Sequence, residues 1–136
     1  MTRAPRSFPA SGQIEWFIEA SPGTPLARLR MVDQTGVVAN KVIRIRNLDT
    51  NRVAAQLYLA PAATAYILLP VGNYGFSVGM GGAWYGPDIH FGATGDYLEG
   101  SGMRLEATTG ASAHEYFLLP SAAGGREMAR VAGSRF

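Results

Sequence analysis

The chain contains no cysteine among its 136 residues. Disulfides, thiolate metal ligands and cysteine nucleophiles are therefore excluded as sources of stability or chemistry. Charged residues are also scarce, at 16% of the sequence, against about a quarter in an ordinary soluble domain. A surface with so little charge is suited to being covered by another protein, so we expect either a protein partner or self-association.

Long hydrophobic runs are missing as well. No apolar segment approaches the length of about 20 residues that a membrane-spanning helix requires. Arg3 and Arg6 make the start of the chain basic, but no apolar segment follows them as it would in a signal peptide. We therefore expect no signal peptide and no membrane insertion. The expected location is the cytoplasm or an assembled particle.

Helical periodicity is the third absence, because no segment sustains apolar residues at i, i+3, i+4 and i+7. The chain instead has 17 glycines, 8 prolines and a series of short segments with strand character. These segments are 13–19, 26–33, 41–47, 53–59, 64–70, 74–80, 102–108 and 113–119. About seven to nine short strands separated by turn residues favour an all-β fold, an antiparallel β-sandwich, with a small β-barrel as the alternative.

The clearest of these strands runs from Tyr74 to Met80, where every large side chain lies two residues from the next. Alternate residues of a strand point to opposite faces of its sheet. The large side chains therefore share one face, and we predict that Phe76 and Val78 belong to the core.

Composition divides the chain into three parts. We predict a flexible N-terminal arm at 1–12, a β-sandwich domain at 13–120 and a flexible basic tail at 121–136. The two ends hold five arginines and one glutamate, whereas the body holds seven basic and nine acidic residues. A nucleic-acid-binding domain presents a basic face with interleaved aromatic residues. The nearly neutral body lacks that face, so we expect no nucleic-acid partner.

The order of features between residues 42 and 92 resembles a pattern in small β-domains of uncharacterised bacterial proteins. The features are Asp49-Thr50, the strand at 53–59, Pro70-Val71-Gly72-Asn73-Tyr74, Trp84-Tyr85-Gly86-Pro87 and Phe91-Gly92. The Pro-x-Gly-x-Tyr turn is also similar to one in carboxypeptidase regulatory-like, or prealbumin-like, sandwiches. This resemblance implies a β-sandwich that acts as a structural or adhesive unit.

Residues suited to catalysis or metal binding are few. Asp88 and His90 lie on one side of an extended segment, and His114 precedes Glu115. Two histidines without a recognisable ligand spacing do not predict a metal site. No Gly-x-Ser-x-Gly nucleophile motif occurs, and the glycine-rich 79–82 lacks the lysine of a phosphate-binding loop. We expect no enzymatic activity, no metal, no cofactor and no small-molecule ligand.

Aromatic residues are concentrated in the loop 81–97. Its candidate binding residues are Trp84, Tyr85, His90, Phe91 and Tyr97. Tryptophan and tyrosine act as anchors at protein interfaces and as platforms for sugars, because they offer a large contact area at a low entropy cost. The structural alternative is a loop that folds over one open end of the sandwich and plugs it with its tryptophan.

Together these observations predict a non-enzymatic structural or protein-interaction module. Low charge, flexible basic ends and an aromatic loop are typical of a subunit whose surface is completed by its neighbours. We expect a repeated subunit of a larger assembly, such as a phage particle (a virion component), a pilus or a secretion machine. The alternative function is a carbohydrate- or peptide-binding module that uses the loop 81–97.

Overall fold

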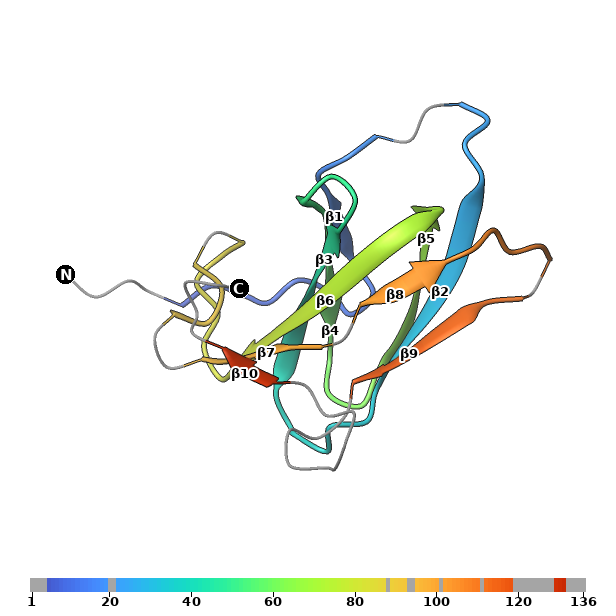
Figure 1. The fold of residues 1–136 in the computed structure, drawn as a ribbon. Coiled ribbons are helices and arrows are strands. Elements are labelled where there is room, and N and C mark those ends of the chain that lie inside the picture. The colour runs from blue at the N-terminus through green and yellow to red at the C-terminus, as the bar shows by residue number, and fades with distance from the viewer. Residues whose placement is uncertain are drawn as a thin grey trace.

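The predicted all-β sandwich is confirmed. The computed structural model describes residues 5–19, 22–87, 89–92, 95–100, 102–110, 112–118 and 129–131. These residues form ten strands in two sheets that face each other, and neither sheet closes into a barrel (Figure 1). In this part of the chain no helix is long and apolar enough to cross a membrane.

The larger sheet contains seven strands. They are β1 (Ile14–Trp16), β3 (Asn40–Asn47), β4 (Arg52–Leu59), β6 (Gly72–Gly81), β7 (Asp96–Glu99), β8 (Met103–Leu105) and β10 (Ala129–Val131). Six of them follow the order β1-β4-β3-β6-β7-β10, and β8 pairs with β6 beyond the end of β7. All of these pairings are antiparallel.

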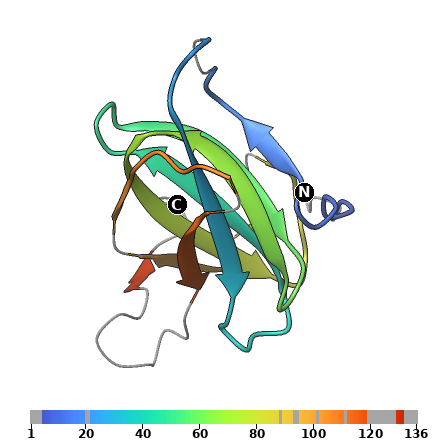
Figure 2. The ribbon, with the colours of Figure 1, turned by 90° about the vertical axis from the view of Figure 1, so that its right-hand side faces the viewer.

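The smaller sheet contains three strands and lies in front of the larger one in Figure 2. They are β2 (Leu26–Asp33), β5 (Thr64–Pro70) and β9 (His114–Leu118), in the order β5-β2-β9. β2 and β5 are antiparallel, whereas β2 and β9 are parallel. This parallel pair is the one departure from the antiparallel arrangement among the described strands.

The main core fills the space between the sheets. Phe76 and Val78 are 1% and 0% exposed, so the prediction that they belong to the core is confirmed. Leu29 and Ile67 face them from the smaller sheet as members of the same buried cluster. The ring of Phe76 lies 4.3 Å from the ring of Tyr116 on β9, measured between centroids. One side chain therefore links the centre of the larger sheet to the edge of the smaller one.

Replacing Phe76 with alanine should lower the free energy of unfolding by about 3–5 kcal/mol, because it leaves a cavity between the sheets. Urea unfolding followed by circular dichroism measures the change. Phe117→Ala is the control, since Phe117 lies on β9 with 39% of its surface exposed. A loss below about 1 kcal/mol for Phe76→Ala would show that the site is not packed as described.

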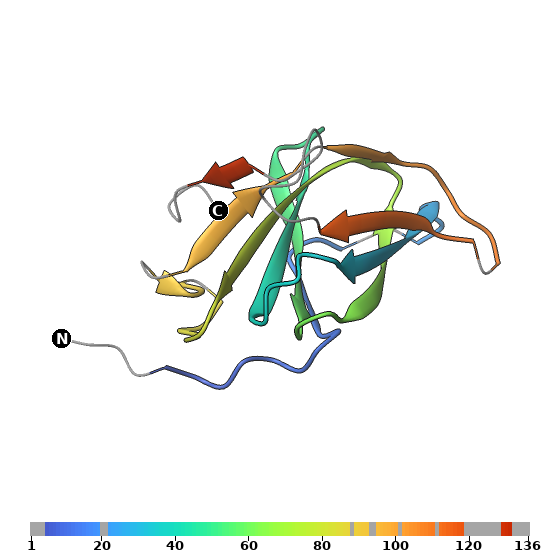
Figure 3. The same ribbon diagram turned by 90° about the horizontal axis from the view of Figure 1, so that it is seen from below.

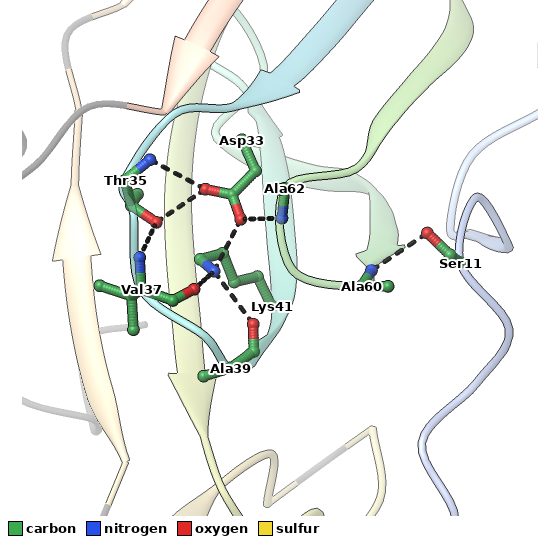
Figure 4. Close-up of polar contacts among 8 residues, drawn as sticks. All are labelled: Ser11, Asp33, Thr35, Val37, Ala39, Lys41, Ala60 and Ala62. Atoms are coloured by element: carbon green, nitrogen blue, oxygen red, sulfur yellow. Dashed lines mark hydrogen bonds and ion pairs between the residues drawn. The ribbon is translucent and has the colours of Figure 1, made fainter.

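Two connections carry the chain between the sheets at the same end of the sandwich, 34–39 from β2 to β3 and 60–63 from β4 to β5. Asp33 and Lys41 hold them together, with 2.7 Å between Asp33 Oδ2 and Lys41 Nζ (Figure 4). The Lys41 ammonium also donates to the carbonyls of Val37 and Ala39. All three of its hydrogens therefore have an acceptor.

The Asp33 carboxylate is equally well satisfied. Its Oδ1 accepts from the backbone N–H and the hydroxyl of Thr35, at 3.0 and 2.7 Å, and its Oδ2 accepts from the N–H of Ala62 at 3.0 Å. Burial acts to raise the pKa of Asp33. The hydrogen bonds from Lys41, Thr35 and Ala62 outweigh that effect and hold the pKa below its ordinary value.

Lys41→Met should lower the free energy of unfolding at pH 7 by about 3–5 kcal/mol, because it leaves the Asp33 carboxylate buried without its cation. Arg104→Met is the control. It breaks the exposed Arg104–Glu106 pair, and exposed pairs contribute only about 0–1 kcal/mol. Equal losses in the two variants, measured by urea unfolding, would contradict the role given to the buried pair.

The Asp33–Lys41 pair also makes the free energy of unfolding depend on pH. The pKa of Asp33 is lower in the folded state than in the unfolded chain, where it is about 3.9. Its contribution is therefore complete above that value and is lost as the pH falls through the folded pKa. In Lys41→Met, burial without a cation should raise the pKa of Asp33, so stability should increase as the pH falls from 7. Urea unfolding measured between pH 3 and 7 gives the free energy of unfolding at each pH. As the pH falls, this free energy should decrease for the unchanged chain and increase for Lys41→Met.

The N-terminal segment passes along the outer edge of the larger sheet (Figure 3). The N–H of Gly12 donates to the carbonyl of Tyr58, and the N–H of Arg6 donates to the carbonyl of Trp84. The Ser11 hydroxyl accepts from the N–H of Ala60 at 3.0 Å. The flexibility of the 1–12 arm stays a prediction. Of the 121–136 tail only 129–131 is described, and it forms the strand β10.

Candidate functional site

The aromatic loop lies on the face of the larger sheet that points away from the smaller sheet. On this face Tyr58, Val42, Gly79 and Tyr97 are neighbours across β4, β3, β6 and β7. Toward its C-terminal end β6 presents glycine on this face, at positions 79 and 81. At Gly81 an added Cβ would lie 2.9 Å from the Cβ of Phe91. The side chain of Phe91 therefore rests directly on the backbone of β6.

Trp84 is the centre of a second buried cluster on this face. Its ring centroid lies 5.2 Å from those of Phe8 and Phe91, 5.6 Å from that of Tyr58 and 5.9 Å from that of His90. Trp84 and Phe91 are 5% and 1% exposed. The loop, drawn in yellow and olive in Figure 1, thus adds a third layer outside the two sheets.

The loop is fixed by its own backbone. His90 has a φ of 60°, its N–H donates to the carbonyl of Gly86, and its carbonyl accepts from the N–H of Tyr85. A left-handed conformation at a residue other than glycine is uncommon and persists where surrounding contacts enforce it. The Tyr97 hydroxyl donates to the carbonyl of Gly92 at 2.9 Å. These bonds aim the aromatic rings at the sheet.

A buried polar network joins the loop to the sheet. Gln56 Nε2 donates to Glu15 Oε1 at 3.1 Å, so its Oε1 faces His90 Nε2, 2.8 Å away. The proton of that contact therefore belongs to His90 Nε2, which fixes the imidazole tautomer. The Tyr58 hydroxyl also donates to Glu15 Oε1, at 3.2 Å. The network therefore connects β1, β4 and the loop by hydrogen bonds.

Burial, followed by the negative charge of Glu15, raises the pKa of Tyr58 to about 12. The phenol therefore stays protonated at neutral pH and cannot act as a general base. Gln56 Nε2 also lies 3.3 Å from the Tyr58 hydroxyl, so the three side chains on β1 and β4 are joined to one another as well as to His90. The arrangement holds the loop in place.

The structure thus brings together four of the five predicted site residues, Trp84, His90, Phe91 and Tyr97, but buries all four. Tyr85 is partly exposed and lies against Gly92. Their role in binding stays a prediction. Their burial favours a structural role for the loop, but the loop covers the outer face of the larger sheet, whereas the structural alternative placed it over an open end of the sandwich.

Gly81→Ala should lower the free energy of unfolding by about 1–3 kcal/mol, because its methyl group would collide with Phe91. Gly82→Ala is the matched control, since a Cβ there meets no atom within 4 Å. Chemical unfolding followed by tryptophan fluorescence reports on both. Equal stability of the two variants would show that Phe91 is free to move off the sheet.

A second candidate site lies at the opposite layer and was missed from the sequence. Four large apolar side chains form a half-exposed strip along β5 and its surroundings, which we call the apolar strip: Trp16, Leu26, Tyr66 and Leu68. Tyr66 and Leu68 are 48% and 52% exposed. Two hollows of about 180 and 570 Å³ border the strip. The guanidinium carbon of Arg28 lies 4.5 Å from the centre of the Tyr66 ring.

The sequence carried a signal for this strip. Residues 66–69 are all large and apolar, so both faces of the strand are apolar, as in strands that are covered on both sides. In the structure Ile67 and Leu69 fill the core, which leaves Tyr66 and Leu68 outside. In a protein of two layers only one face of such a strand packs against the other sheet. The second apolar face of β5 is therefore available to another protein chain.

The outer face of the larger sheet also holds a polar hollow of about 420 Å³, lined in part by Arg44, Arg46, Asn51 and Glu99. Arg46 Nη1 donates to the carbonyl of Asn51 at 3.1 Å. The lining mixes both signs of charge and selects no ligand class. Among the described residues no three His, Cys, Asp or Glu side chains lie close enough to hold a metal. Asp88, one of the residues considered as a ligand, lies outside them.

No family profile, no curated protein and no solved structure matches the chain. The similarity to prealbumin-like sandwiches therefore stays a prediction.

Proposed function

We propose that the protein is a non-enzymatic protein-interaction module that associates with other protein chains through the apolar strip. The observation that carries this proposal is the half-exposed state of Trp16, Tyr66 and Leu68 on one side of the molecule. Apolar side chains gathered in one exposed patch mark interaction surfaces more often than scattered ones do. Tryptophan and tyrosine are also enriched among residues that dominate binding energy.

The chemistry of the remaining surface supports the same proposal. Charged residues are few, and charge is depleted in the centres of interfaces. The loop aromatics are held by their own packing and hydrogen bonds, which leaves little of their area for a sugar or peptide. A repeated subunit of a larger assembly, such as a phage particle, pilus or secretion machine, is the role that this surface fits.

Light scattering across a range of protein concentrations tests the proposal. We expect the molecular mass to rise above that of the monomer, and Leu68→Ser to weaken association about tenfold or more, because burying a leucine contributes about 1.5–3 kcal/mol. Leu48→Ser is the matched control, since Leu48 is 49% exposed but lies away from the strip, against Gly75 and Gly102.

A different result would favour ligand binding at the loop 81–97 over association through the apolar strip. A chain that stays monomeric at every concentration and binds an array of glycans or peptides, with binding lost in Tyr85→Ala, would contradict the proposal. Tyr85 is suited to this comparison because it is partly exposed and stands outside the buried cluster.

A further inference from the structure

One edge of the smaller sheet is free in the described part of the chain. β5 pairs with β2 on one side, and no described strand pairs with it on the other. An unpaired edge presents a row of backbone N–H and C=O groups that another strand can bind. The edge is seven residues long, which is enough for a stable pairing when apolar side chains accompany it.

The register shows which groups point outward. The N–H of Val71 donates to the carbonyl of Pro25, and the N–H of Asp33 donates to the carbonyl of Ala63. In an antiparallel pair the residues that bond to the neighbour alternate along the strand. The odd-numbered residues of β5 therefore bond to β2, and Thr64, Tyr66 and Leu68 direct their N–H and C=O groups to the free edge.

β5 also lacks the features that normally protect an edge. Natural edge strands carry charged residues, prolines or bulges that discourage pairing with other chains. Each of the other described edge strands contains a charged residue: Glu15 on β1, Arg104 on β8, Glu115 on β9 and Arg130 on β10. β5 has none, and its proline, Pro70, is the last residue of the strand.

We propose that β5 pairs with β5 of a second copy of this chain, antiparallel across a two-fold axis at Tyr66. This inference deepens the proposed function, because it names the partner and the geometry of its interface. In this register Tyr66 faces Tyr66 of the second copy, and Thr64 faces Leu68. All three outward-facing residues are then paired, and Pro70, which has no N–H, lies beyond the paired segment.

The absence of charge favours a second copy over a different protein. A two-fold axis brings identical residues together, so any charge near the axis would meet its own sign. β5 itself places no charge at the axis; the Arg28 guanidinium on the neighbouring β2 lies against the Tyr66 ring, 4.5 Å from its centre. The same axis joins the exposed side chains of Tyr66 and Leu68 to those of the second copy, and it extends the smaller sheet from three strands to six.

The absence of cysteine from the chain makes single-cysteine variants a direct test. Paired residues bonded across antiparallel strands lie about 5.5 Å apart between Cα atoms, within the range of about 4.4–6.8 Å that a disulfide spans. Tyr66→Cys should therefore form covalent dimers under mild oxidation. Thr64→Cys should form few alone but should cross-link when mixed with Leu68→Cys. Leu48→Cys, half-exposed elsewhere, is the control.

Leu68→Pro provides a second measurement. It removes an outward N–H without touching a bond to β2, so the fold should persist by circular dichroism while dimers are lost. Association without the cross-links at 64, 66 and 68 would overturn strand pairing and leave the proposed function standing, with another surface as its interface. A monomer at every concentration, in which Tyr66→Cys cross-links no faster than Leu48→Cys, would overturn strand pairing as well. The glycan and peptide arrays then decide the proposed function.

Discussion

The Asp33–Lys41 ion pair is the constraint on which the arrangement of the two sheets depends. It lies where two of the connections between the sheets meet, β2 to β3 and β4 to β5, and its atoms also bind the backbone of Thr35, Val37, Ala39 and Ala62. The attraction within a buried ion pair offsets the free-energy cost of removing both charges from water only when their remaining hydrogen-bonding groups are satisfied. Here the satisfied groups belong to these two connections, so the pair holds this end of the smaller sheet over the larger one.

The fold was predictable wherever side chains alternate. β6 is the clearest example, since Tyr74, Phe76, Val78 and Met80 are separated by small residues and all four are buried. β7 was not predictable, because it is only four residues long and follows a glycine-rich loop. β10 has only three residues and owes its conformation to pairing with β7. Short strands of this kind are defined by their partners, which a sequence pattern does not show.

The candidate sites divide in the same way. The residue types of the aromatic loop stood out in the sequence, but their burial depends on Gly79 and Gly81 of β6, to which a single-sequence pattern does not connect them. For the apolar strip, the signal in the sequence was a strand that is apolar on both faces. Deciding which face is exposed required the packing of Ile67 and Leu69 against the larger sheet. Periodicity therefore gives the faces of a strand, and only topology gives its neighbours.

The place of Phe8 in the second cluster has a practical consequence. Its ring lies 5.2 Å from Trp84 and 5.6 Å from Tyr58, so a segment from the start of the chain completes a cluster built from its middle. Proteolytic trimming between Phe8 and Gln13 during purification would uncover Trp84 and create an adhesive face that the intact chain does not have. Mass spectrometry of the intact chain should accompany any measurement of its association, so that aggregation of trimmed protein is not mistaken for native assembly.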